Sequence, residues 1–253
     1  MDIHSICRFA EGLFSDCQPS EDYSNNGLQV EASRECRRVA FAVDACLETI
    51  RAAAEADAQL LMVHHGLSWG GGFRRLSGID ARRFSELFTH GVSLYACHLP
   101  LDAHPIIGNN AVLARRMGLE VSSRFASYGG VALGTVCMLP EPQSLAQIAD
   151  NARAHINPAL QLLDFSGDKP LRTVAFLSGS GGSCIEECAE LGIDCLVTGE
   201  FSHSRYHLAK EAGVSVIIAG HYATEDTGIR ELMKSVRDAL HLETIFIDAP
   251  TGL

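Results

Sequence analysis

The sequence lacks an excess of basic residues, and it lacks any long apolar run. Its 253 residues carry a formal net charge of −11 at pH 7. Nucleic acids and anionic membranes are normally bound through a basic face, so this balance argues against both kinds of partner. Apolar runs such as VSVIIA, at 214–219, are far too short to cross a bilayer. We therefore expect neither a nucleic-acid partner nor a membrane partner.

We also expect neither a signal peptide nor a disulfide framework. Residues 1–14 place Asp2, Arg8 and Glu11 among apolar residues, which is typical of an amphipathic helix and not of a signal peptide. The nine cysteines are scattered without CxxC pairs. This usage is typical of reduced thiols, so we expect a cytoplasmic protein.

What the sequence does contain is a repeated order of elements. Apolar content is 47%, enough for a substantial core in one large domain or two modest ones. Near-continuous apolar strands alternate with helical patterns, which indicates parallel strands covered on both faces. Strand, helix, strand, helix and strand follow one another twice, at 37–43, 45–57, 58–63, 81–91 and 91–102, and again at 171–177, 183–192, 193–200, 204–213 and 213–225.

These repeats predict an α/β fold of two pseudo-repeated βαβαβ lobes. The intervening segment is typical of a small α+β insert, with a helix beginning near Ser144 and turn signals at Pro140 and Pro142. The expected domains are therefore an N-terminal lobe at 1–128, the insert at 129–170 and a C-terminal lobe at 171–253.

Polar residues follow the predicted strands at corresponding places in both lobes. In open parallel sheets, ligands bind beyond the carboxyl ends of the strands. Imidazole and carboxylate groups without thiolate suit Zn, Fe, Mn or Ni, so we expect a metal site between the lobes. The residues gathered there are His64, His65, His98, Asp102, Glu200, His203, His221 and Glu225.

The spacing of these residues makes three local predictions. His64 and His65 end a strand, and a regular strand sends neighbouring side chains to opposite faces, so the backbone should turn at this pair. His221 and Glu225 are four residues apart and meet on one face if a helix begins there. The pair of His98 and Asp102 has the same spacing, but Pro100 favours a loop.

Three further stretches leave alternatives open. The glycine-rich loop of Ser178, Gly179, Ser180 and Gly181 can hold a phosphate through its amides, but without a Walker lysine a plain turn fits equally well. The Asn-Gly turn in 25–30 indicates a hairpin or a loop entry. Trp69 and Phe73 either cover the site or anchor their own loop.

Four motifs in their order along the chain resemble the NIF-three-like family. They are NGLQV at 26–30, VHHG at 63–66, the H-x-x-x-D of 98–102 and GHYATE at 220–225. Members are often labelled dinuclear metal-centre proteins or GTP cyclohydrolase I type 2 homologues. The resemblance spans essentially the whole chain and fits the short form of the family.

The resemblance implies two adjacent divalent metal ions per chain and a homo-hexamer. Position by position, His65 and Asp102 would bind one ion, His64 and His221 would bind the other, and Glu225 would bridge them. His98 would lie at the edge of the site.

The reaction that this site implies is metal-dependent hydrolysis of a phosphorylated or nucleotide-like small molecule. Protons would be moved by His98, Glu200 or His203. The alternative is a non-catalytic protein that stores, delivers or senses metal.

Overall fold

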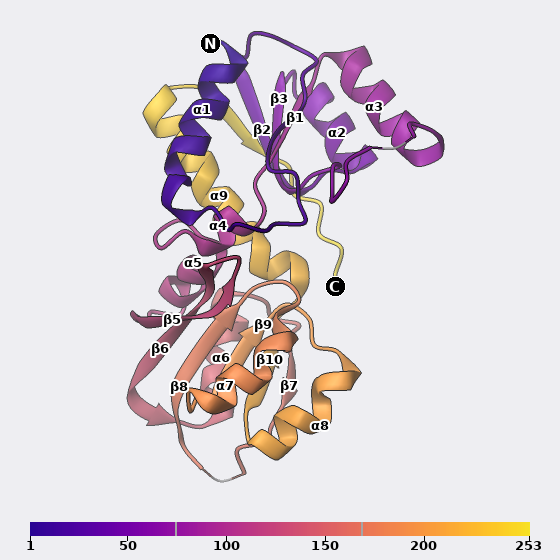
Figure 1. Cartoon of the computed structure of the whole chain (residues 1–253). Helices are drawn as coiled ribbons and strands as arrows, with labels where there is room; N and C mark the ends of the chain where they lie inside the picture. Colours follow the sequence, from indigo (N-terminus) through magenta and orange to yellow (C-terminus); the bar gives the residue numbers. More distant parts are fainter. Residues whose placement is uncertain (74, 168) are drawn as a thin grey trace. The chain divides into compact units, whose positions relative to one another are not determined.

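The computed structural model describes residues 1–73, 75–167 and 169–253, which form two compact units (Figure 1). Unit 1 comprises Met1–Leu101 and Gly228–Ala249, and unit 2 comprises Asp102–Thr227 and Pro250–Leu253. These units differ from the predicted domains at 1–128, 129–170 and 171–253. Each unit combines segments that are distant in sequence. Pairing between strands far apart in the chain brings these segments together, and local turn signals do not reveal it.

Unit 1 is built on a five-stranded sheet of order β1-β4-β3-β2-β11. The inner pairs are parallel, and only the edge strand β1 runs antiparallel to its neighbour β4. The predicted strand–helix–strand–helix–strand order is confirmed from β2 to β4. The strands are β1 (Gly27–Val30), β2 (Arg38–Asp44), β3 (Leu60–His65), β4 (Ser93–Ala96) and β11 (Glu243–Phe246).

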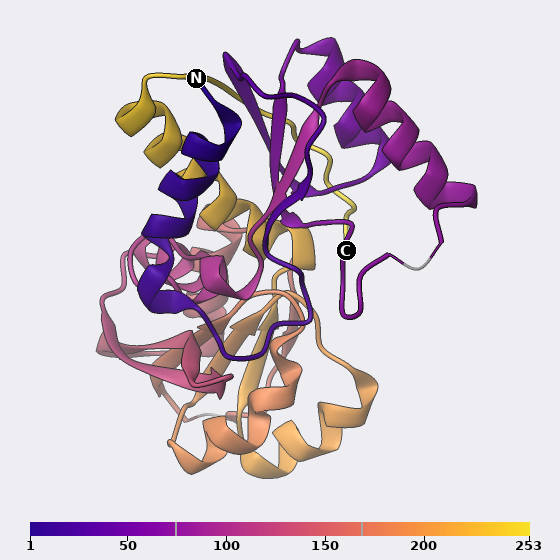
Figure 2. The same ribbon diagram turned by 45° about the horizontal axis from the view of Figure 1, so that its top comes forward.

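Helices cover both faces of this sheet. Helices α1 and α9 lie on one face, and α2 and α3 lie on the other (Figures 1 and 2). Phe41 and Leu61 are both fully buried within the central strands. The near-continuous apolar character of these strands therefore has the expected cause, burial on both faces. The helices of this unit are α1 (Ile3–Leu13), η1 (Ser15–Cys17), α2 (Leu47–Glu55), α3 (Gly78–His90) and most of α9 (His221–Leu240).

Unit 2 is built on a six-stranded sheet of order β5-β6-β8-β9-β10-β7. Strands β8, β9 and β10 are mutually parallel, as the second repeat predicts, and the other pairs are antiparallel. The strands are β5 (Val121–Tyr128), β6 (Val131–Gln143), β7 (Gln161–Leu163), β8 (Leu171–Leu177), β9 (Cys195–Thr198) and β10 (Ser215–Ile218).

The two faces of this second sheet are buried by different helices. Val174 and Phe176 of β8 pack in one cluster with α5 and α6, and Ala175 and Leu177 pack in another with α7 and α8. This alternation is the two-residue period of a strand. The helices are α5 (Asn109–Arg116), α6 (Leu145–His155), η2 (Gly181–Cys184), α7 (Ile185–Glu190) and α8 (His203–Ala212), together with the first residues of α9.

The segment 129–170 is not a separate insert. Its strand β6 pairs with β8, and its strand β7 pairs with β10, so both extend the sheet of unit 2. Its helix begins where predicted, because Ser144 caps the first turn of α6 by accepting a hydrogen bond from the Gln147 amide. Two helices connect the units along the chain. They are α9 and the short α4 (Leu99–Ala103).

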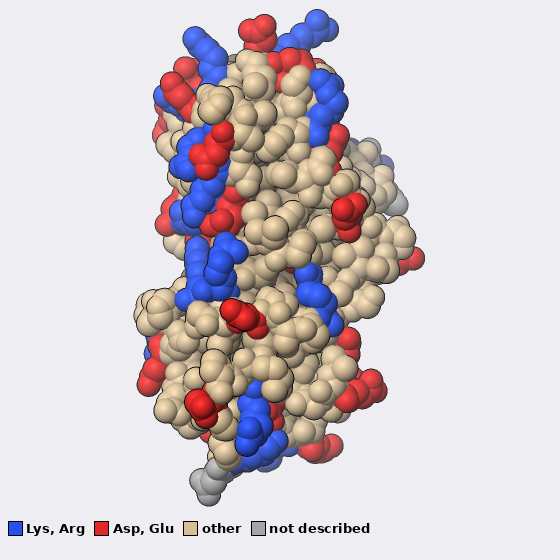
Figure 3. All heavy atoms as spheres, turned by 90° about the vertical axis from the view of Figure 1, so that its left-hand side faces the viewer, with Lys and Arg blue, Asp and Glu red and all other residues tan. Residues whose placement is uncertain are grey.

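The charged side chains and the cysteines are arranged as the composition leads us to expect. On the face shown in Figure 3, acidic and basic side chains are interspersed among uncharged ones. The nine cysteines are free. Among the described residues, no helix combines the length and apolar character needed to cross a membrane.

Candidate metal centre

The two adjacent histidines lie within a strand, so the predicted turn at this pair is wrong in position. Strand β3 continues through His65, and the chain leaves it at Gly66. The two imidazole rings nevertheless lie close, with centroids 4.6 Å apart. At the last residues of a strand, long side chains from both faces can reach past its end. His64 is fully buried and His65 is partly exposed.

His98 completes a group of three histidines in unit 1. Its ring centroid lies 5.1 Å from that of His64 and 5.6 Å from that of His65. One nitrogen from each of the three rings lies within 4.8 Å of the others, so the group could hold a metal ion. His98 therefore lies beside both other histidines, although the resemblance implied only a place at the edge.

The predicted loop after His98 is a helix. Helix α4 begins at Leu99, and Pro100 occupies its first turn. Proline is tolerated there because the amides of the first turn have no partner within the helix. Asp102 accordingly lies one helical turn along the chain from His98.

Every histidine of the predicted site except His203 is held in the same way. In each ring Nδ1 lies next to an oxygen that can only accept, so Nδ1 carries the proton and Nε2 is the nitrogen that can bind a metal ion. The distances from Nδ1 are 2.9 Å for His64 to the carbonyl of Cys97, 2.8 Å for His65 to Asp44, 2.9 Å for His98 to Asp22 and 2.5 Å for His221 to Glu200. Orientation of this kind is typical of metal-binding histidines.

Asp22 and Asp44 were not singled out from the sequence. Asp44 ends β2, and its position beside the end of β3 is set by strand order. Burial raises the pKa of Asp22, but hydrogen bonds from His98 and Asn26 outweigh it, and the net pKa is lowered. The Asp22 carboxylate also accepts from the Leu99 amide at 3.1 Å. It therefore stays ionised beside His98.

The NGLQV motif shapes the loop that follows the histidine pair. Gln29 Oε1 accepts from the amides of Leu67 and Ser68, at 2.7 and 3.0 Å, and its Nε2 donates back to the Ser68 carbonyl. A Cβ at Gly66 would lie 2.3 Å from Gln29 Oε1, so a larger residue here would displace the Gln29 side chain. Asn26 accepts from the His98 amide at 2.8 Å. Residues Gly27–Val30 of the motif form the edge strand β1, which pairs with the distant β4, so the motif is not a hairpin.

In unit 2, the start of α9 presents His221 and Glu225 on one face, as their spacing predicts. His221 Nε2 lies 3.0 Å from Glu225 Oε2. The hydrogen bond with Glu225 raises the pKa of His221 to about 9, against the effect of burial and with a further contribution from Glu200. Glu225 is buried, whereas the Glu200 side chain is about half exposed.

Two glycines let the chain approach this helix start closely. A Cβ at Gly179 would lie 2.3 Å from Glu225 Oε1, and a Cβ at Gly199 would lie 2.7 Å from the Cα of His221. Both glycines follow strands of the parallel core, β8 and β9. Gly179 also has a positive φ of 59°. The glycine content of these loops is therefore explained by packing against His221 and Glu225.

Asp102 is buried in unit 2 within a network of neutral donors. Its Oδ1 accepts from Asn109 Nδ2 at 2.8 Å and from Ser178 Oγ at 2.9 Å. The Ser178 amide in turn donates to Asn110 at 2.7 Å. These contacts orient the carboxylate through amide and hydroxyl groups.

The glycine-rich loop gains no support as a phosphate site. The amide of Gly179 donates to Thr224 at 3.2 Å, and that of Gly181 donates to Thr198 at 2.9 Å. Ser180 donates to the Glu200 carboxylate at 3.1 Å, a neighbour that repels anions. His203 is exposed and is the first residue of α8. None of the hydrogen bonds found among the described residues supports its predicted role in proton transfer. Both assignments stay predictions.

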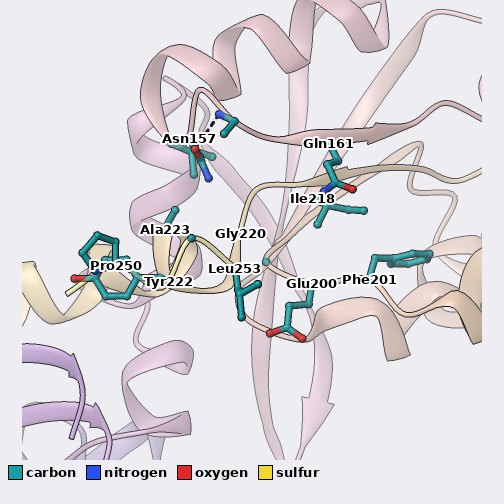
Figure 4. A pocket seen from close by; sticks show the side chains of 14 residues that line it. Asn157, Gln161, Glu200, Phe201, Ile218, Gly220, Tyr222, Ala223, Pro250 and Leu253 are labelled. Atoms are coloured by element: carbon teal, nitrogen blue, oxygen red, sulfur yellow. Dashed lines mark hydrogen bonds between the residues drawn. The ribbon is translucent and has the colours of Figure 1, made fainter. Parts of the chain in front are cut away.

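A pocket of about 660 Å³ opens in unit 2 next to Glu200 (Figure 4). Phe201 lines it after β9, and Gln161 contributes from the edge strand β7. Asn157 is fixed in the wall, because its Nδ2 donates to the Ala219 carbonyl at 2.9 Å. Since Glu200 also holds His221, its carboxylate connects the pocket to the histidine.

Comparison with known proteins matches the whole chain. The family described as Duf34/NIF3 (NGG1p interacting factor 3) matches residues 1–252. A protein of Archaeoglobus fulgidus named GTP cyclohydrolase 1 type 2 homolog is 44% identical over 254 residues, covering 100% of both chains. The structures of TTHA1606 from Thermus thermophilus and of the protein ybgI, described as of unknown function, are 39% and 31% identical, with TM-scores of 0.88 and 0.92 over 100% of both chains. The resemblance drawn from the four motifs is confirmed.

Proposed function

The chain belongs to the Duf34/NIF3 family, and we propose that it is a dinuclear-metal-dependent hydrolase acting on a phosphorylated or nucleotide-like small molecule. The observation that supports this most directly is the common orientation of four histidines, each with Nδ1 on an acceptor oxygen. A structural histidine needs no such uniform arrangement, whereas metal ligands use it to direct Nε2 at the ion.

We assign the ligands in two sets. His65 and Asp102 would hold one ion, His64 and His221 would hold the other, and Glu225 would serve both. The continuity of the chain supports this proposal, since α4 and α9 each carry residues of both units. Imidazole and carboxylate donors suit Zn, Fe, Mn or Ni.

Bound divalent ions would polarise a substrate oxygen and lower the pKa of a water molecule. The residues of the chain supply positioning and proton transfer. His98 moves protons beside the histidine pair, and Asp22 holds its ring in place with Oδ1 2.9 Å from Nδ1. Glu200, half exposed at the pocket, accepts a proton from the substrate side while it holds His221 in place. His203 is kept as a third candidate for proton transfer.

Elemental analysis of protein purified without chelator tests the metal assignment, with His65→Ala as the comparison. We expect about two transition-metal ions per chain in the wild type and a clear loss in the variant. The loaded protein is then assayed with GTP first, because curated relatives carry the name GTP cyclohydrolase 1 type 2 homolog, and next with phosphate esters. Metal without hydrolysis of any of these would favour the alternative of a metal-storing, metal-delivering or metal-sensing protein.

Two further parts of the proposal concern assembly and compartment. We propose a homo-hexamer, which light scattering of the purified protein tests directly. We propose the cytoplasm as the compartment, because nine free cysteines suit a reducing environment.

A further inference from the structure

Tyr23 is exposed, and its ring lies against a neighbouring loop. Its relative exposure is 70%. The ring lies against Gly70, where a Cβ would be 3.0 Å from two of the Tyr23 ring carbons. The Gly70 amide donates to the Tyr23 carbonyl at 2.6 Å, and Ser24 pairs with Trp69 in an antiparallel bridge. Because Tyr23 is not buried, packing in the core does not explain why this large aromatic side chain lies here at the surface.

Trp69 connects this exposed ring to the histidines. Its indole N–H donates to the Gly66 carbonyl at 2.9 Å, which fixes the ring. The indole stands edge to face with His98 at a centroid distance of 5.1 Å, and it lies 6.1 Å from the ring of His65. Tyr23 follows at 6.4 Å with an interplanar angle of 31°. The two rings thus form an aromatic surface that runs outward from the histidine group.

Phe73, in the same loop as Trp69, behaves differently. It packs edge to face on Phe84 at 4.6 Å, and Phe84 is buried. Phe73 is therefore the anchor of the loop. From the sequence, Trp69 and Phe73 either cover the site or anchor their own loop. The structure divides these roles: Phe73 anchors the loop, and Trp69 lies against the histidines.

We propose that Tyr23 and Trp69 form a stacking platform that binds a planar heteroaromatic ring of the substrate. This rests on the proposed function, since it places the ring next to the histidines of the metal centre. Aromatic side chains stack on any planar ring, and a platform that is already fixed loses little entropy on binding. The platform selects a ring-bearing substrate, such as a nucleotide, over a sugar phosphate.

The sole tryptophan of the chain gives a direct readout. Because Trp69 is the only tryptophan, fluorescence excited at the indole band reports on this platform alone. The probes are guanosine monophosphate and nicotinamide mononucleotide, with ribose 5-phosphate as the matching compound without a ring. Each is titrated into the metal-loaded protein and into the chelator-treated protein. The variants are Tyr23→Ala and Tyr128→Ala, the latter an exposed tyrosine of β5 that is 46% exposed.

We expect saturable quenching by at least one ring-bearing probe and weaker binding of ribose 5-phosphate. Tyr23→Ala should weaken binding of the ring-bearing probe about ten-fold, the usual size of one stacking contact, while Tyr128→Ala changes nothing. Binding by Tyr23→Ala equal to the wild type, or no quenching by either ring-bearing probe, overturns the proposal. Ring binding by a protein that takes up no metal even on reconstitution would leave the platform intact and refute the metal-centre function instead.

Discussion

Asp44 and His65 stand opposite each other in register on two parallel strands, and Asp44 Oδ1 lies 2.8 Å from His65 Nδ1. The carboxylate accepts from Nδ1, which fixes the ring and leaves Nε2 as the nitrogen directed away from Asp44. A pair of neighbouring strand ends thus supplies both a nitrogen that could bind a metal ion and the group that orients it.

Replacing Asp44 should weaken metal binding without removing a ligand. For Asp44→Ala we expect metal affinity to fall by about 10- to 100-fold, because His65 loses the acceptor that orients it. Competition with a chromophoric chelator measures this loss. The control is Asp150→Ala, an exposed carboxylate on α6. Equal affinities for Asp44→Ala and the wild type would remove Asp44 from the metal centre.

Glu225→Ala should lose metal most severely of the carboxylate variants. Under the proposed assignment one carboxylate serves both ions, so its removal lowers affinity by more than about 100-fold. Elemental analysis after gel filtration reports the loss. Glu231→Ala, on the same helix but paired with Lys234, provides the comparison. Retention of both ions in Glu225→Ala would contradict the bridging role.

Gly179→Ala should disturb the metal centre through its side-chain methyl group. The new Cβ would lie 2.3 Å from Glu225 Oε1, and the backbone there has a φ of 59°. Gly192→Ala is a matched control, since its φ is 67° but no atom lies within 4 Å of the added Cβ. Both variants carry the backbone strain of about 1 kcal/mol, but only Gly179→Ala should also lose metal. Chemical unfolding and metal content separate the two effects.

Asp194 should stabilise the fold in a pH-dependent way. Burial raises its pKa, but Lys169 at 2.7 Å and hydrogen bonds from Arg172 and Thr173 outweigh this and lower the net pKa. Because the folded pKa lies below the unfolded one, the stabilisation is present above about pH 4 and is lost as the pH falls further. Asp194→Asn should therefore lower the free energy of unfolding by about 1–3 kcal/mol at pH 7. Urea titrations should show this difference shrinking below about pH 4; a difference independent of pH would contradict the ionised role.

The order and type of the elements could be predicted from the sequence because they depend on local periodicity. The strand β8 has the predicted bounds, 171–177, and α6 begins next to Ser144, near which a helix start was predicted. His221 and Glu225 were expected to meet on one face if a helix begins there, and α9 does begin at His221.

Other local predictions failed where two local effects competed. Pro100 was taken to prevent a helix, but it lies in the first turn of α4, where a missing amide costs nothing. The turn expected at His64 and His65 lies one residue later, at Gly66. No turn is needed at the pair itself, because both rings reach past the end of the strand.

By itself, the sequence determined which residues could bind metal and at which strand ends they lie, because hydrophobic patterning locates the strand ends. Only the tertiary structure decided which groups orient those residues. Asp44 meets His65 because β2 lies beside β3, and Asn26 meets His98 because β1 pairs with β4. Strand order also decided the units, since β6 joins β8 and β11 returns to β2. These pairings join segments far apart in the chain, and no local pattern of residues specifies them.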